Sequence, residues 1–269
     1  MRVVFLAASE YGVECLKCAS GIPECNVVGI ITMPEQYTIT YDKGKVKKSG
    51  NKALPALIQF SENYGKELYI SKKMNSTDTV NKIREWNPDL IIVSGWYQMI
   101  GREILSIPSK GVIGLHASML PQYRGGAPLV WQMINGEEYA GISLFYMDEG
   151  CDTGDIIAQE KVRIYESDTI KELYERAGKI GIKILCENIP LIEKGKANRI
   201  RQEIDDKNVP YPIRSEADGL IDWDKSPKEI MNFVRAQTRP YPGAYTIIGN
   251  KKVTIWDCRV EEIEKKDNV

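Results

Sequence analysis

The stretch Leu90-Ile91-Ile92-Val93-Ser94 is apolar on both faces until its last residue. A strand of this kind is typical of a parallel sheet, because helices cover both faces of such a sheet. Val112 to Leu115 repeats the signal, and Val3 to Ala8 and Asn26 to Thr32 predict two more strands of the same sheet. Apolar residues recur at helical spacing between these strands, so we expect strands and helices to alternate.

The predicted helices and the remaining strands follow the order of a doubly wound α/β fold. The helices are Tyr11 to Ala19, Leu54 to Tyr64, Ser76 to Trp86, Pro128 to Asn135 and Thr169 to Lys194, and the further strands are Leu68 to Ser71, Ile142 to Met147 and Ile156 to Val162. The polar stretch from Pro34 to Lys52 shows no clear apolar period and is predicted to be a long loop. We therefore predict a Rossmann-like parallel sheet, whose ligands bind beyond the carboxyl ends of its strands.

The chain divides into a large domain, a linker and a small tail. We expect the domain to span residues 1–196, the charged and proline-containing linker to run over the surface at 197–219, and an α+β tail to fill 220–269. In the tail, Ser226 to Ala236 predicts a capped helix, and the strands Ala244 to Ile248 and Lys251 to Trp256 flank a Gly-Asn turn. One helix and two strands cannot form a core alone. The tail must therefore dock on the domain or on a second subunit of a homodimer.

Charge and composition exclude several classes of protein. The 36 Lys and Arg residues nearly cancel the 37 Asp and Glu residues, so contact with nucleic acid would have to be local. No stretch approaches the roughly 20 apolar residues of a membrane span, and the run Val3 to Ala8 is too short for a signal peptide. We therefore expect a cytoplasmic protein with no membrane partner.

Six cysteines are scattered along the chain, and two of them, Cys15 and Cys18, form a Cys-x-x-Cys. A zinc site would need a second ligand pair at similar spacing, and the chain has a single histidine. We predict no metal site, and we expect the cysteines of a cytosolic chain to be reduced.

The most unusual segment runs Gly114-Leu115-His116-Ala117-Ser118-Met119-Leu120-Pro121-Gln122-Tyr123-Arg124-Gly125-Gly126-Ala127-Pro128. It follows a predicted strand, and it places the only histidine among paired glycines and two prolines where an α/β sheet offers its ligand crevice. The alternative is a hydrogen-bonded core histidine in an ordinary connection. The residues alone do not separate these two interpretations.

A second segment, Met147-Asp148-Glu149-Gly150-Cys151-Asp152-Thr153-Gly154-Asp155, also follows a predicted strand and gathers acids around two glycines. It could be a solvated turn, a weak calcium loop, or a loop that directs one carboxylate at a histidine. The regular acidic alternation of a calcium-binding EF-hand loop is missing, which disfavours calcium.

Together these segments resemble the formyltransferase family, which includes methionyl-tRNA, glycinamide ribonucleotide and sugar N-formyltransferases. The resemblance begins at Arg2 to Ala19 and peaks at His116-x-Ser118-x-Leu120-Pro121-x-Tyr123-Arg124-Gly125. It continues through Asp148-Glu149-Gly150-x-Asp152-Thr153-Gly154-Asp155, and the tail from Ile221 to Ala244 is similar to the family's linker and second domain. The resemblance implies a folate-dependent N-formyltransferase with 10-formyltetrahydrofolate as its formyl donor.

Carried over by position, the resemblance implies that His116 is the catalytic histidine and Asp152 the aspartate that pairs with it. Formyl transfer requires a group that moves the amine proton and a donor that stabilises the oxyanion, and a carboxylate fixes the tautomer of a histidine beside it. The resemblance also places the folate pocket at Gln98, Met99, Ile100, Ser118, Leu120, Pro121, Asp148, Glu149, Gly150 and Cys151.

One position departs from the family's pattern. The family usually has an asparagine two residues before the histidine, where it polarises the formyl oxygen, and this chain has Gly114. Loss of one such donor costs about 10² to 10³ in rate. We expect a protonated His116, a backbone N–H, a water or the Ser118 hydroxyl to replace it. A catalytically impaired relative that binds folate or a nucleotide sugar is the alternative.

The acceptor amine is predicted to belong to a nucleotide-linked amino sugar, because the tail ends soon after one hairpin and the net charge is only −1. Methionyl-tRNA is the alternative acceptor. It is favoured by the five lysines between Asp42 and Lys52, which could contact phosphates, although they could equally be a solvated loop. Glycinamide ribonucleotide is the third candidate.

Overall fold

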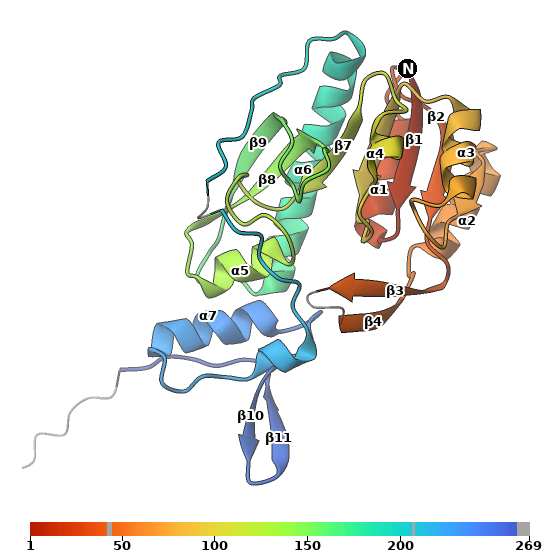
Figure 1. Cartoon of the computed structure of the whole chain (residues 1–269). Coiled ribbons are helices and arrows are strands. Elements are labelled where there is room, and N and C mark those ends of the chain that lie inside the picture. The colour runs from red at the N-terminus through yellow and green to blue at the C-terminus, as the bar shows by residue number, and fades with distance from the viewer. Residues whose placement is uncertain (42–44, 206–207, 263–269) are drawn as a thin grey trace, which may run out of the picture.

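A computed structural model describes residues 1–41, 45–205 and 208–262, and it contains a seven-stranded central sheet (Figure 1). The order across the sheet is β5 (Leu68–Ile70), β2 (Asn26–Thr32), β1 (Arg2–Ala7), β6 (Leu90–Ser94), β7 (Val112–His116), β8 (Tyr139–Tyr146) and β9 (Ile156–Arg163). The first five strands are parallel, which confirms the Rossmann-like fold. Strand β8 pairs antiparallel with both β7 and β9. The segment between β8 and β9 is too short for the crossover of about a dozen residues that a parallel pair needs.

Helices cover both faces of the sheet, and β1 is apolar and buried from Val3 to Ala7. Val3, Phe5 and Ala7 face a core built with α1 (Glu10–Ser20), α2 (Leu54–Tyr64), α5 (Pro128–Ile134) and α6 (Ile170–Glu193). Val4 and Leu6 face a second core, which α3 (Thr77–Trp86) and the short helix α4 (Arg102–Leu105) close. This two-sided burial explains why the strands read as continuous apolar runs.

Caps set the helix starts where the sequence predicts them. The Ser76 side chain accepts a hydrogen bond from the Thr79 N–H, and Thr169 and Ser226 form capping boxes with the glutamates three residues later.

Within the described part of the chain, no helix combines the length and the apolar character that a membrane span requires.

The prediction of a loop from Pro34 to Lys52 is wrong for most of its length. Strands β3 (Gln36–Tyr41) and β4 (Lys45–Gly50) pair in antiparallel register as a separate hairpin. Among the side chains that the structure describes here, Tyr37, which is 8% exposed, and Ile39 beside it mark the buried side of the hairpin. A two-stranded ribbon exposes most of its residues, so its alternation is weak in the sequence. Residues 42–44 lie outside the described part.

The tail contains a 3₁₀ turn (Glu216–Gly219), α7 (Pro227–Gln237), β10 (Ala244–Ile248) and β11 (Lys251–Ile255). Helix α7 docks on the large domain, since its Ala236 is fully buried in the core that α5 and α6 share. Figure 1 shows α7 beside α5, with the β10–β11 hairpin projecting away from both. The two domain boundaries stay a prediction.

The expectation that every cysteine is reduced is wrong for one pair. Cys18 on α1 and Cys186 on α6 form a disulfide, with their Cα atoms 6.7 Å apart. The two helices lie on the same face of the sheet, so residues far apart in sequence meet there. Cys15 is instead a free, fully buried thiol. Among the described residues, no three His, Cys, Asp or Glu side chains gather as metal ligands would.

Candidate active site

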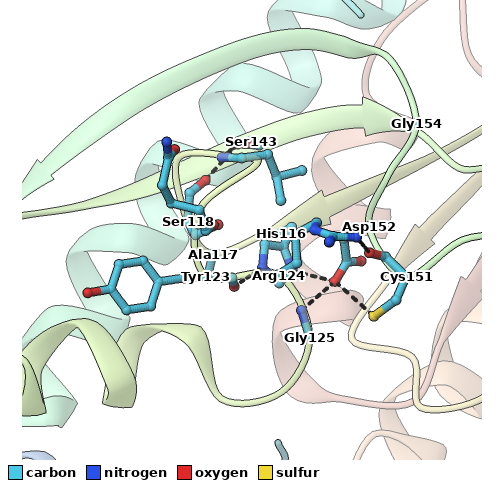
Figure 2. Close-up of polar contacts among 12 residues, drawn as sticks. His116, Ala117, Ser118, Tyr123, Arg124, Gly125, Ser143, Cys151, Asp152 and Gly154 are labelled. Carbon is cyan, nitrogen blue, oxygen red and sulfur yellow. Dashed lines mark hydrogen bonds and ion pairs between the residues drawn. The ribbon is translucent and has the colours of Figure 1, made fainter. Parts of the chain in front are cut away.

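His116 is the last residue of β7, at the carboxyl end of a strand in the middle of the sheet. Its side chain is 8% exposed and lies between two acceptors (Figure 2). The Nε2 atom is 2.8 Å from the main-chain oxygen of Tyr123, and Nδ1 is 3.5 Å from Oδ2 of Asp152. A carbonyl can only accept, so the hydrogen bond to Tyr123 requires the proton on Nε2. In a neutral imidazole, the unprotonated Nδ1 then faces Asp152.

The loop after β7 turns back on itself and supplies both the Tyr123 carbonyl and a donor to Asp152. Tyr123, Gly125 and Ala127 all have positive φ angles, of 54°, 92° and 48°. The Gly125 N–H donates to Oδ2 of Asp152 at 2.9 Å. A Cβ atom at Gly125 would lie 2.5 Å from the main-chain oxygen of Tyr211, so only glycine fits this turn.

Asp152 belongs to the loop between β8 and β9, and its backbone is held in the left-handed region at φ 55°. That conformation costs a non-glycine residue roughly 1–2 kcal/mol, so the surrounding contacts must hold it. Asp148 closes the same loop, because its Oδ1 accepts from the Thr153 hydroxyl at 2.6 Å and from the Gly150 N–H at 3.0 Å. Asp148 therefore shapes the loop, and Asp152 carries the carboxylate that faces His116.

Cys151 precedes Asp152 and is half-buried. Its Sγ lies 3.7 Å from Oδ2 of Asp152. Burial first, and then the neighbouring carboxylate, raises the pKa of the Cys151 thiol to about 11. The thiol is therefore protonated at neutral pH and can act only as a weak donor.

Ser118 and Leu120, two of the predicted folate residues after His116, are buried and make contacts within the protein, and their role toward folate stays a prediction. Ser118 is fully buried, and its hydroxyl donates to the Gln122 oxygen at 2.6 Å. A hydroxyl has one proton, so the suggestion that Ser118 replaces the missing oxyanion donor is not supported by this geometry. Leu120, joined to Pro121 by a cis peptide bond, is 3% exposed and packs against Phe145.

The segment Gln98 to Ile100 presents little side chain to a ligand. The Gln98 Oε1 accepts from the Met74 N–H at 2.8 Å, and Ile100 is 4% exposed in the core beneath α3. Met99 is 59% exposed. A folate at this segment would contact mainly the main chain and the Met99 thioether.

Asp148, Glu149 and Gly150 line an open cavity of about 440 Å³, together with Arg102, Leu105 and Ser106. Ligand pockets typically measure roughly 300–1,000 Å³, so the size suits a small molecule. Nε of Arg102 lies 3.5 Å from Oε1 of Glu149, which places one cation beside the acids. Residues 148–150 are among the predicted folate residues, and that assignment stays a prediction. Arg102 was not predicted, because a single surface arginine carries no motif.

Gly114 lies two residues before His116 on β7, so the two positions share a face of the strand. It pairs with Phe145 of β8. A Cβ atom at Gly114 would lie 3.2 Å from Sδ of Met147, the flexible end of a side chain. A side chain here would therefore point toward the site and require only a small movement of Met147.

Arg124 belongs to the motif that follows His116, but the sequence does not predict its role. Its side chain is 7% exposed, and Nη1 donates to the Cys151 oxygen at 3.0 Å. Nη2 donates to the Asn208 oxygen. Arg124 thus ties the loop after His116 to the loop of Asp152, a role that depends on contacts between distant segments.

Solved structures similar to this one include transferases of formyl groups. A sugar N-formyltransferase from Shewanella has a TM-score of 0.72 at 18% identity, and the match covers 98% of this chain and 99% of that one. Methionyl-tRNA formyltransferase from Clostridium thermocellum has a TM-score of 0.62 at 21% identity, with coverage of 97% and 94%. At such low identities the likeness establishes the fold alone.

Sequence comparison establishes the family. Residues 1–189 match the family Formyl transferase, and residues 214–268 match Formyl transferase, C-terminal domain. The chain is 37% identical to methionyl-tRNA formyltransferase of Clostridioides difficile (strain 630), over 99% of this chain and 83% of the relative. It is 34% identical to that of Halothermothrix orenii, over 95% and 78%. The chain belongs to the formyl transferase family: it is a folate-dependent N-formyltransferase with 10-formyltetrahydrofolate as its donor.

Proposed function

We propose that this protein transfers the formyl group of 10-formyltetrahydrofolate to the amino group of methionyl-tRNA. The observation that carries the proposal is the 37% identity to the Clostridioides difficile methionyl-tRNA formyltransferase along 99% of this chain. Two solved sugar N-formyltransferases are similar at 18% and 21% identity, where only the fold is informative. This order of acceptors reverses the one predicted from sequence, which placed an amino sugar first.

The small tail and the net charge do not exclude tRNA as the acceptor. The tail is no evidence against tRNA, because residues 214–268 match the family's C-terminal domain. The net charge of −1 excludes only a uniformly basic surface, and a local cluster of lysines is enough to contact phosphates.

The β3–β4 hairpin and the residues just after it supply local positive charge. Lys48 of β4 and Lys52 are both exposed. The Tyr37 ring of β3 stacks on the Tyr97 ring at 5.8 Å, next to the predicted folate segment. Figure 1 shows the hairpin beyond the edge where the parallel strands end, which is also the edge of His116. This position supports the proposal that the hairpin contacts the phosphates of a tRNA whose methionyl amino group reaches His116.

The proposed chemistry uses the His116–Asp152 pair. 10-Formyltetrahydrofolate supplies the formyl group, and a bond forms from the acceptor nitrogen to the formyl carbon while the bond from that carbon to N10 breaks. Nδ1 of His116 accepts the proton that the amine loses. Oδ2 of Asp152, 3.5 Å from Nδ1, stabilises the resulting imidazolium. The proton then passes to N10, so charge and atoms balance.

The oxyanion donor is the part of the site that Gly114 leaves open. Both ring nitrogens of His116 face acceptors of the protein, so a backbone N–H or a water is the donor that remains for the formyl oxygen. A binding protein without turnover is the second candidate function, and Gly114 is the observation that favours it.

A formylation assay tests the proposal. The purified protein is incubated with 10-formyltetrahydrofolate and, separately, with methionyl-tRNA and a panel of nucleotide-linked amino sugars. The proposal expects the mass gain of a formyl group on the methionyl residue alone. Formylation of a sugar without formylation of methionyl-tRNA would refute it, and no product with any amine would support the binding protein.

A further inference from the structure

The linker follows the loops of the site instead of bridging the domains freely. Ile200 exchanges two main-chain hydrogen bonds with Ile156 at the start of β9, at 2.8 and 2.9 Å. Further along, the Tyr211 N–H donates to the Arg124 oxygen at 2.7 Å, and the Gly126 N–H donates to the Tyr211 oxygen at 2.8 Å. The linker therefore contacts both loops that supply partners to His116.

Between these two points, Gln202 reaches into the loop of Asp152. Its Nε2 donates to the Asp152 oxygen at 3.0 Å and to the Gly154 oxygen at 2.6 Å. The side chain is 7% exposed. A primary amide has two N–H donors, and both are used on carbonyls of the same loop, on either side of Thr153.

Asp152 needs such support because its φ angle of 55° is unfavourable for a residue with a side chain. Backbone strain of this kind persists only where the surroundings over-determine the conformation. If the two hydrogen bonds from Gln202 were lost, the Asp152 backbone could relax toward an ordinary conformation. Its carboxylate would then turn away from His116, which is already at the long distance of 3.5 Å.

We propose that Gln202 is a positioning residue, which holds the Asp152 main chain in the conformation that directs the carboxylate at Nδ1 of His116. Gln202 lies in the linker, outside the motifs that carry the family resemblance. The inference rests on the proposed pairing of His116 with Asp152. It makes the linker part of the active site, as well as a connection to the second domain.

The single histidine of the chain allows a test that does not depend on turnover. Protein labelled with ¹⁵N-histidine has one imidazole, so the Nδ1 signal reports the Asp152 carboxylate directly. Gln202→Met removes both donors at similar volume. We expect it to shift the Nδ1 signal in the same direction as Asp152→Asn. The matched control is Gln237→Met, because Gln237 is 2% exposed and donates to the Asp218 oxygen in the tail; it should leave the signal in place.

Kinetics provide the second readout. We expect Gln202→Met to lower kcat on methionyl-tRNA by about 10- to 100-fold, as small displacements of catalytic groups do, with little change in KM. In an Asp152→Asn background, the same change should cost less than about 3-fold, because residues that act through one another are not additive. Should Gln202→Met fail to fold, Gln202→Asn keeps the amide but is too short to reach both carbonyls, and it should shift the same signal.

The outcomes separate the inference from the proposed function. An unchanged Nδ1 signal in a folded Gln202 variant, or an equal kcat loss in both backgrounds, overturns the role of Gln202. If Asp152→Asn itself leaves the Nδ1 signal unchanged, the pairing is wrong and the inference falls with it. Failure of the wild type to formylate methionyl-tRNA refutes the proposed acceptor, but the Nδ1 test still decides on Gln202.

Discussion

The substitution Gly114→Asn tests how the site stabilises the oxyanion. The new Cβ would lie 3.2 Å from Sδ and 3.4 Å from Cγ of Met147, and 3.5 Å from Cε1 of Phe145. Only the Met147 contacts are tight, and that side chain is flexible. Gly114 is not among the positive-φ residues, so the backbone accepts asparagine. We therefore expect the free energy of unfolding to change by less than about 1 kcal/mol, as for other well-tolerated substitutions.

The effect on rate depends on whether another donor already works. One missing oxyanion donor costs about 10² to 10³ in kcat, or roughly 3–4 kcal/mol. We expect another donor to be in place, so Gly114→Asn should change kcat on methionyl-tRNA by less than about 10-fold. Gly114→Ala is the control, because it adds the Cβ atom without a donor. A gain of 100-fold or more in the asparagine variant alone, about the full value of one donor, would refute the reasoning.

Three further predictions concern the groups around the site. Replacing Lys48 and Lys52 by alanine should lower the slope of log affinity for tRNA against log salt by about 2, measured by filter binding; an unchanged slope would place the tRNA elsewhere. Burial and then Asp152 raise the pKa of the Cys151 thiol to about 11, so the thiol should be neutral at pH 7.5. Its alkylation, followed by mass spectrometry, should be about 100-fold slower than for a cysteine of ordinary pKa and should accelerate as the pH rises toward 11. Rapid alkylation at pH 7.5 would contradict the raised pKa. Arg124→Met should lower the free energy of unfolding by about 1–3 kcal/mol in urea denaturation, because it leaves two carbonyls without their donor; an unchanged midpoint would mean that the two loops hold together without it.

The sheet and its helices could be predicted because they bury continuous apolar runs. β2, β6 and α2 begin and end where their patterns do. The β3–β4 hairpin could not be predicted, because the two buried positions described in it, Tyr37 and Ile39, stand in a polar, lysine-rich stretch without a clear apolar period. The Cys18–Cys186 disulfide depends on two helices meeting across the sheet face, which spacing does not encode.

The candidate site was predictable only in part, for a related reason. His116 and Asp152 each follow a predicted strand, but β7 and β8 are antiparallel, so their approach depends on the fold of the loop after β8 and not on a shared sheet edge. The Gln202 amide donates to main-chain oxygens and Tyr211 acts through its own main chain, so their partners are groups that every residue carries and that form no motif. Ser118 shows the opposite failure: its place in the motif suggested a free donor, but its hydroxyl is committed to the Gln122 oxygen.

The central claim is that His116 drives formyl transfer to methionyl-tRNA. A single-turnover experiment tests it most directly, with wild type and His116→Ala in excess over methionyl-tRNA and saturated with 10-formyltetrahydrofolate. The account predicts formyl-methionyl-tRNA with the wild type, and a rate at least about 100-fold lower with the variant, as expected when a general acid–base group is removed. Equal rates for the two proteins, or a wild type that formylates an amino sugar but not methionyl-tRNA, would contradict it.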